Sequence, residues 1–143
     1  ILNLTDGKSL RDPMSLRVTT DDRIDVVDVT DRIAGELPPI EAGLCTVFVE
    51  HTTAAVSINE AEPRLLGDVE QFVAGLPASG GWDHDALDGN ADAHLRSSLI
   101  GRSVAVPFRD GDLALGTWQS ILLIECDGPR ERSLSVTFTE AVN

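Results

Sequence analysis

The stretch GLCTVFV at residues 43–49 decides the fold, because it is a nearly continuous apolar run made largely of residues that favour strands. Such a run predicts a central strand that is buried in its sheet. The stretch MSLRVTT at residues 14–20 alternates apolar and polar side chains and predicts a second strand. Further strands are predicted at residues 24–29, 54–58, 103–108, 117–125 and 133–139.

One long helix is predicted after Pro63, a residue that suits the first turn of a helix. Apolar residues then recur at helical spacing from Leu65 to Leu76, and Pro77 ends the pattern. Asp68 lies at the edge of this apolar stripe, so we expect its side chain to be partly buried.

Two shorter helices are predicted, one capped by Asp28 or Thr30 and running to about Leu37, and one at residues 92–99. Residues 77–91 form a long polar segment, and loops of this length in a compact domain are usually functional or disordered. The strands are joined by short turns, and the helices are segregated between groups of strands. This order predicts an α+β fold, a largely antiparallel sheet with two or three helices packed on it, in a single domain spanning residues 1–143.

The charge balance excludes several classes of partner. The chain carries 24 acidic and 11 basic residues, for a formal net charge of -13, so its surface repels nucleic acid and anionic lipid. No apolar run reaches the roughly 18 residues of a membrane helix, and no signal peptide is visible, which favours a cytoplasmic location. Cys45 and Cys126 lie in apolar runs without a Cys-x-x-Cys spacing, and we expect both to be buried free thiols.

The chain has three histidines, His51, His84 and His94, each set among small and polar residues. Neutral imidazoles from three separate elements would suit one Zn²⁺-like ion with an open position for water or substrate. The alternative is that each histidine is an ordinary hydrogen-bonded or surface residue. Acidic residues nearby in the sequence are available as acceptors behind such a site; these are Glu60, Asp83, Asp85 and Asp92.

Arg130 and Arg132 follow the turn after the predicted strand at residues 117–125. Both are candidates for a bidentate anion clamp, and the alternative is a pair of solvated arginines at a strand edge. Trp118 and Gln119 open the same strand, where they would shape a pocket or simply pack. Glu60 has a similar alternative, as the cap of the helix that follows it.

Taken in order along the chain, these motifs resemble those of the YjbQ family, described as having secondary thiamine-phosphate-synthase activity. The series is His51-Thr-Thr-Ala54, Asn59-Glu60, Asp68, His84, Gly89-Asn-Ala-Asp-Ala-His94, Gly101, Gly116-Thr-Trp-Gln119, Glu125 and Arg130-x-Arg132. The resemblance implies an α+β fold, a homotrimer with a polar pocket near a subunit interface, and a divalent metal held by the histidines. The metal would be zinc, with magnesium as the alternative.

The implied activity is that of a transferase that joins hydroxymethylpyrimidine diphosphate to a thiazole phosphate, with a small phosphorylated molecule as ligand. Departure of pyrophosphate needs cations where the charge develops. On this interpretation the catalytic residues are His51, Glu60, Asp92 and Arg132, and the metal ligands are His51, His84 and His94. The substrate-binding residues are Thr52, Thr53, Asn59, Asn90, Trp118, Gln119 and Arg130. A metal-dependent hydrolase and a non-catalytic trimeric module that binds a metal or an anion are the competing predictions.

Overall fold

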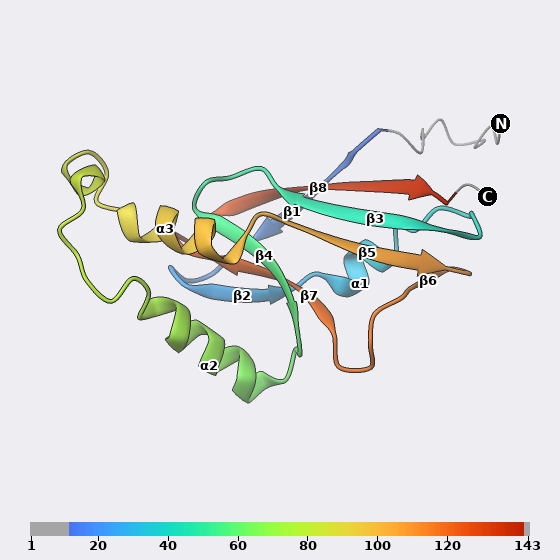
Figure 1. Ribbon diagram of the computed structural model, residues 1–143, viewed down its shortest axis with the longest axis horizontal. Helices are drawn as coiled ribbons and strands as arrows, with labels where there is room; N and C mark the ends of the chain where they lie inside the picture. The colour runs from blue at the N-terminus through green and yellow to red at the C-terminus, as the bar shows by residue number, and fades with distance from the viewer. Residues whose placement is uncertain (1–11, 142–143) are drawn as a thin grey trace.

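The apolar run at residues 43–49 lies in a central strand of the computed structural model, which describes residues 12–141. This strand, β3 (Ala42–Val49), pairs with β8 (Glu131–Glu140) on one side and β5 (Ser103–Arg109) on the other. With β1 (Met14–Thr19) and β6 (Asp112–Leu113) they form a five-stranded sheet of order β1-β8-β3-β5-β6 (Figure 1).

A second sheet packs on the first. Its central strand β7 (Ser120–Glu125) lies between β2 (Asp25–Asp28) and β4 (Ala54–Asn59). The pairings in both sheets are antiparallel. Inward side chains of both sheets and of the short helix α1 (Thr30–Ala34) share one core, so the main hydrophobic contact is sheet on sheet. Its fully buried members include Ile33, Cys45, Val47, Val49, Ile121, Leu123 and Leu134.

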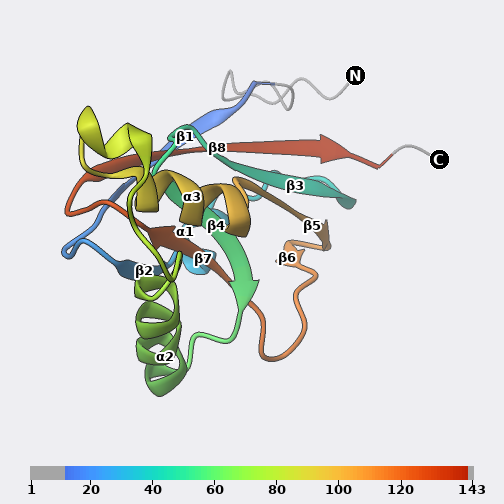
Figure 2. The ribbon, with the colours of Figure 1, turned by 60° about the vertical axis from the view of Figure 1, so that its left-hand side comes forward.

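Two helices, α2 (Pro63–Ala74) and α3 (Ala91–Ile100), cover the other face of the three-stranded sheet. α2 begins as predicted with Pro63 in its first turn, and the Glu62 carboxylate caps it by accepting a hydrogen bond from Leu65 N. The loop joining α2 to α3 contains a short 3₁₀ helix, η1 (Asp83–Ala86), and runs along one end of the molecule (Figure 2). Buried side chains on this side are Val26, Ala55, Val73, Ala93, Leu122, Ile124 and Cys126.

The outer face of the five-stranded sheet differs from the inner one. Along β8 the inward side chains are buried, while the alternate side chains are partly or fully exposed, and β5 follows the same alternation. Phe48 of β3 is 47% exposed on this face and Leu44 is 39% exposed. Within the described residues the layers are therefore this open sheet face, the shared core, the three-stranded sheet, and the helices α2 and α3.

The predicted fold class is confirmed, with local differences. The strands divide between two sheets. α1 ends at Ala34 and not near Leu37, and β7 begins at Ser120 because the Gln119 side chain closes a turn by accepting from Gly116 N. Asp68 is exposed, so the prediction of partial burial is wrong.

The cysteine prediction is also confirmed. Cys45 and Cys126 are buried and free, and burial raises the pKa of each thiol to about 11. None of the helices in residues 12–141 is long and apolar enough to cross a membrane.

Candidate functional site

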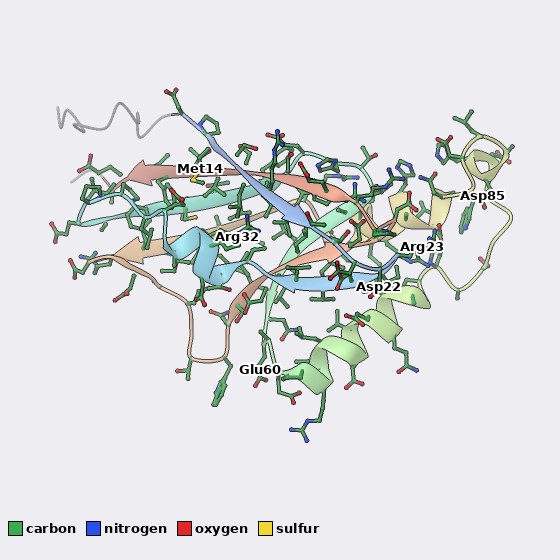
Figure 3. The ribbon with its side chains drawn as sticks, turned by 180° about the vertical axis from the view of Figure 1, so that it is seen from behind. Met14, Asp22, Arg23, Arg32, Glu60 and Asp85 are labelled. Carbon is green, nitrogen blue, oxygen red and sulfur yellow. The ribbon has the colours of Figure 1, made fainter. Side chains whose placement is uncertain are left out.

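A polar hollow of about 810 Å³ opens at the end of the molecule where four segments meet. These segments are the loop between α2 and α3, α3 as far as Arg96, the turn that follows β7, and the turn between β1 and β2. Figure 3 shows Arg23, from the turn between β1 and β2, at the same end of the molecule as Asp85 of the loop. The lining residues are Arg23, Pro77, Ser79, Gly80, Trp82, Asp85, Asp88, Gly89, Asn90, Asp92, Arg96, Asp127 and Arg130.

One charged group of the hollow is the pair formed by Arg23 and Asp92. The Arg23 guanidinium donates two hydrogen bonds to the Asp92 carboxylate, at 3.1 and 2.9 Å. This fork geometry is the strong form of an arginine–carboxylate pair. The hydrogen bond from Arg23 holds the pKa of Asp92 below its usual range, and Asp92 raises the pKa of Arg23 in return. Arg96 adds a second cation, with its Nη1 3.0 Å from Asp92 Oδ2.

A chain of side-chain hydrogen bonds joins the turn after β7 to the loop. Asn90 Nδ2 donates to Asp127 Oδ2 at 2.9 Å, which leaves Asn90 Oδ1 to accept from His84 Nε2 at 3.1 Å. The His84 ring meets the His94 ring edge to face, with centroids 4.8 Å apart. Arg130 holds Asp127 from the other side, since its Nε donates to the Asp127 backbone carbonyl at 2.8 Å. The His84 and His94 rings therefore lie next to Asn90, which lines the hollow.

A second arginine–carboxylate pair lies beneath the turn that carries Asp127 and Arg130. Glu125 is fully buried and Arg132 is 3% exposed. Arg132 Nε donates to Glu125 Oε2 at 2.7 Å, and Arg132 Nη2 donates to Glu125 Oε1 and to the hydroxyl of Thr53. Burial raises the pKa of Glu125, but the hydrogen bonds from Arg132, Asp127 N and Thr20 outweigh burial and leave the pKa below its usual range. The predicted clamp of Arg130 and Arg132 on one anion does not assemble, because Arg132 turns inward to Glu125.

His51 lies in a different, shallower hollow with Phe48, Thr52 and Arg102. Its Nε2 accepts a hydrogen bond from Ser133 N at 2.9 Å, so the neutral ring carries its proton on Nδ1. Burial, followed by the nearby charge of Arg132, lowers the pKa of His51. This hydrogen bond ties the end of β3 to the start of β8.

The predicted three-histidine metal site does not fit this geometry. His84 and His94 are neighbours, but the described residues hold no group of three His, Cys, Asp or Glu side chains that could bind a metal ion. His51 has its Nε2 lone pair engaged by Ser133 N. We therefore derive no chemistry through zinc or magnesium.

The remaining predicted site residues are dispersed. Glu60 directly follows the six-residue strand β4, whereas His51 precedes it, and such a strand separates its ends by about 20 Å. The predicted role of Glu60 in orienting His51 is therefore wrong, and Figure 3 places Glu60 away from Arg23 and Asp85. Glu60 does not cap α2 either, since the capping side chain is Glu62. Asn59 is exposed beside Glu60, Thr52 is exposed, Thr53 is buried against Arg132, and Trp118 and Gln119 are exposed in the turn before β7.

Sequence reasoning missed Arg23, Asp127 and Arg96 as members of the hollow. Arg23 lies in the predicted turn after the first strand, and its partner Asp92 is 69 positions away. Asp127 lies in the turn before the predicted arginine pair. The sequence predicted that turn but not that Asp127 would accept a hydrogen bond from Asn90. Arg96 is on α3 with only 5% exposure, and a buried arginine was not expected on so short a helix.

Comparison with known proteins gives the chain a family. Residues 14–141 match the family described as UPF0047 protein YjbQ-like. A UPF0047 protein of Archaeoglobus fulgidus is 47% identical over 124 residues, covering 86% of this chain and 98% of the relative. Among solved structures, hypothetical protein APE1520 of Aeropyrum pernix K1 has a TM-score of 0.85 and 44% identity, covering 91% of this chain and 99% of its own.

The function predicted from the sequence is overturned by these comparisons. A further solved relative, with a TM-score of 0.81, 36% identity and coverage of 88% of this chain and 94% of its own, is described as a YbjQ-like protein of unknown function from Sulfolobus solfataricus P2. The relatives point neither to thiamine phosphate synthesis nor to metal-dependent hydrolysis, and a metal cluster is missing from the described residues. The predicted transferase, hydrolase and metal- or anion-binding module are therefore withdrawn. Because the match extends over most of its length, the chain belongs to the UPF0047 family of YjbQ-like proteins.

Proposed function

We propose that this chain is a binding protein for a small polar molecule that enters the hollow around Arg23, Asn90 and Asp127. The observation that carries the proposal is that two sets of side-chain hydrogen bonds line the hollow, one from Arg23 to Asp92 and one from Asp127 through Asn90 to His84, with Arg23 Nε 3.7 Å from Asp127 Oδ1 between them. Its volume of about 810 Å³ is within the range of small-molecule sites.

Preorganisation supports a binding role over a purely structural one. Asp127 is anchored from below, because its backbone N donates to Glu125 Oε1 at 3.0 Å. Asn90 is held in one amide orientation by its two partners. Side chains fixed in this way lose little freedom when a ligand binds, which lowers the cost of association.

The charges of the hollow bear on the predicted phosphorylated ligand. Three arginines and four aspartates line it. Each of the three arginines has an aspartate within salt-bridge distance, at 2.9 Å for Arg23, 3.0 Å for Arg96 and 3.4 Å for Arg130. A phosphate would have to break these pairs in a chain of net charge -13. The lining therefore favours a ligand without a full negative charge.

Thermal unfolding of the parent and of the variant Asn90→Ala, each with a defined panel of monosaccharides, amino acids and nucleosides, tests the proposal. A ligand that binds the folded chain raises its melting temperature with concentration. We expect at least one compound to stabilise the parent and the matched control Asn59→Ala, whose amide is exposed at the end of β4. The same compound should leave Asn90→Ala unchanged. Equal shifts in all three proteins, or no shift in the parent, would contradict the proposal.

Self-association is part of the same proposal. The open face of the five-stranded sheet presents Phe48 and Leu44 among small and hydroxyl side chains, and a second copy of the chain would cover it. We expect a homotrimer by light scattering, and a lower mass for Phe48→Glu. A monomeric parent at micromolar concentration would refute this part alone.

A further inference from the structure

We infer that the ligand of the hollow is a neutral polyhydroxylated molecule, a free sugar or a polyol. The inference rests on the proposed function, because it names the ligand class of the same hollow. Three features of the lining carry it: the balance of its charges, the mixture of donors and acceptors left at its surface, and one fixed aromatic ring.

The first feature is that the strongest charges of the hollow are already neutralised. Asp92 Oδ1 accepts from Arg23 and from Ala93 N, while Asp92 Oδ2 accepts from Arg23 and lies 3.0 Å from Arg96 Nη1. Both oxygens of this carboxylate therefore accept hydrogen bonds, and Arg96 Nη1 lies close to Asp92 Oδ2 without forming one. An anionic ligand would have to compete with Asp92 for these arginines, whereas an uncharged ligand would leave the pairs intact.

The second feature is that donors and acceptors remain side by side. Arg130 is 54% exposed at its side chain and offers N–H groups. Asp88 is 60% exposed at its side chain and offers carboxylate oxygens, and Asp127 Oδ1 lies 3.7 Å from Arg23 Nε. A hydroxyl group donates one hydrogen bond and accepts others, so a ligand with several hydroxyls satisfies both kinds of group at once.

The third feature is the indole of Trp82, which lines the hollow and is 37% exposed. Its Nε1 donates to the Ser79 carbonyl at 3.1 Å, which fixes the direction of the ring. A fixed aromatic face suits the C–H face of a sugar or cyclitol, which is apolar although its edge carries hydroxyls. The other tryptophan, Trp118, is 72% exposed and does not line the hollow.

Because the chain has two tryptophans, fluorescence isolates the one at the hollow. In the variant Trp118→Phe, Trp82 is the single indole reporter. We would titrate this protein with glucose, galactose, ribose and myo-inositol, and with inorganic phosphate and glycine as charged and zwitterionic comparisons. The matched variant Trp82→Phe, which keeps Trp118, reports any response outside the hollow.

We expect a saturable fluorescence change with at least one of the four hydroxylated probes, unaltered by added salt, and no change for Trp82→Phe. Calorimetry should show affinity weakened about fivefold to tenfold in Trp82→Ala and unchanged in Trp118→Ala. Failure of all four probes overturns the inference, as does saturation by phosphate or glycine alone. The proposed function is overturned separately, when no compound of the thermal panel distinguishes the parent from Asn90→Ala.

Discussion

The two arginine–carboxylate pairs of this chain have the same chemistry in opposite surroundings. Arg132 and Glu125 are buried between the sheets, with side-chain exposures of 3% and 0%, whereas Arg23 and Asp92 lie at the hollow with 47% and 28%. Taking charges out of water is expensive, so the buried pair persists only because both partners and their hydrogen bonds are present. The exposed pair gains little stability from its contact and forms part of the polar lining of the hollow. The buried pair therefore holds the turn at residues 127–130 in place, since Glu125 accepts from Asp127 N. The exposed pair lies beside that turn, with Arg23 Nε 3.7 Å from Asp127 Oδ1.

The largest effect is expected for Arg132→Met, which leaves the Glu125 carboxylate buried without its cation. Breaking a buried pair on one side typically costs about 3–5 kcal/mol of the free energy of unfolding. Denaturant unfolding followed by circular dichroism measures this cost. The double variant Arg132→Met with Glu125→Leu should recover much of the loss, because no charge then remains buried. A single variant as stable as the parent would contradict the structural role of the pair.

A smaller effect is expected for Thr20→Val, which removes one hydroxyl and keeps the side-chain shape. Thr20 Oγ1 donates to Glu125 Oε2 at 2.8 Å and accepts from Arg130 N at 2.9 Å, so it links the buried pair to the turn. Leaving buried groups short of a partner costs about 1–3 kcal/mol. Unfolding measurements give the cost, and Thr117→Val on the exposed turn before β7 is the matched control. A cost equal to that of the control would show that the link is not needed.

The fold was largely predictable, because burial patterns repeat along each segment. The alternation at residues 14–20 and the apolar run at residues 43–49 each identified a strand, and Pro63 located the start of α2, which ends at Ala74, two residues before the predicted Leu76. The division into two sheets was not predictable, since alternation shows which face is buried without showing which strand is the neighbour. Phe72 shows the limit for helices: it fits the helical spacing, yet it is 69% exposed, because α2 turns only one side to the sheet.

The site was less predictable than the fold. His84, Asn90 and Asp92 were singled out from one polar segment, and the structure places them close together because they are near in sequence. Arg23 could not be linked to them, since its partner is 69 positions away. Arg132 was predicted to bind an anion together with Arg130, but the inward face of β8 carries it to Glu125. Sequence shows which polar residues are present, while long-range pairing decides which of them face a ligand.

The variant Arg23→Gln tests the exposed pair of Arg23 and Asp92. An exposed ion pair contributes about 0–1 kcal/mol to stability, so unfolding should change little. Added salt should narrow the difference between variant and parent, because exposed pairs are screened. We would measure ligand affinity by calorimetry with a compound found in the thermal panel. The affinity should fall about tenfold, because the two hydrogen bonds that the Arg23 guanidinium donates to Asp92 are lost. A large loss of stability, comparable to that of Arg132→Met, would contradict the contrast between the two pairs.

The smallest effect is expected for His51→Gln, and it concerns pH. The pKa of His51 is lowered in the folded chain from its ordinary value of 6.5, first by burial and then by Arg132, while Glu50 and Glu125 act in the opposite direction. Between the folded and unfolded pKa values the unfolded chain binds more protons, so the contribution of His51 to stability is complete above pH 6.5 and is lost as the pH falls below it. Glutamine has an amide oxygen that can still accept from Ser133 N, but it does not titrate. Unfolding at several pH values between 5 and 8 should therefore show a shallower decline for His51→Gln than for the parent, with similar stability at pH 8. Parallel pH profiles would mean that the hydrogen bond between the end of β3 and the start of β8 does not depend on the neutral ring.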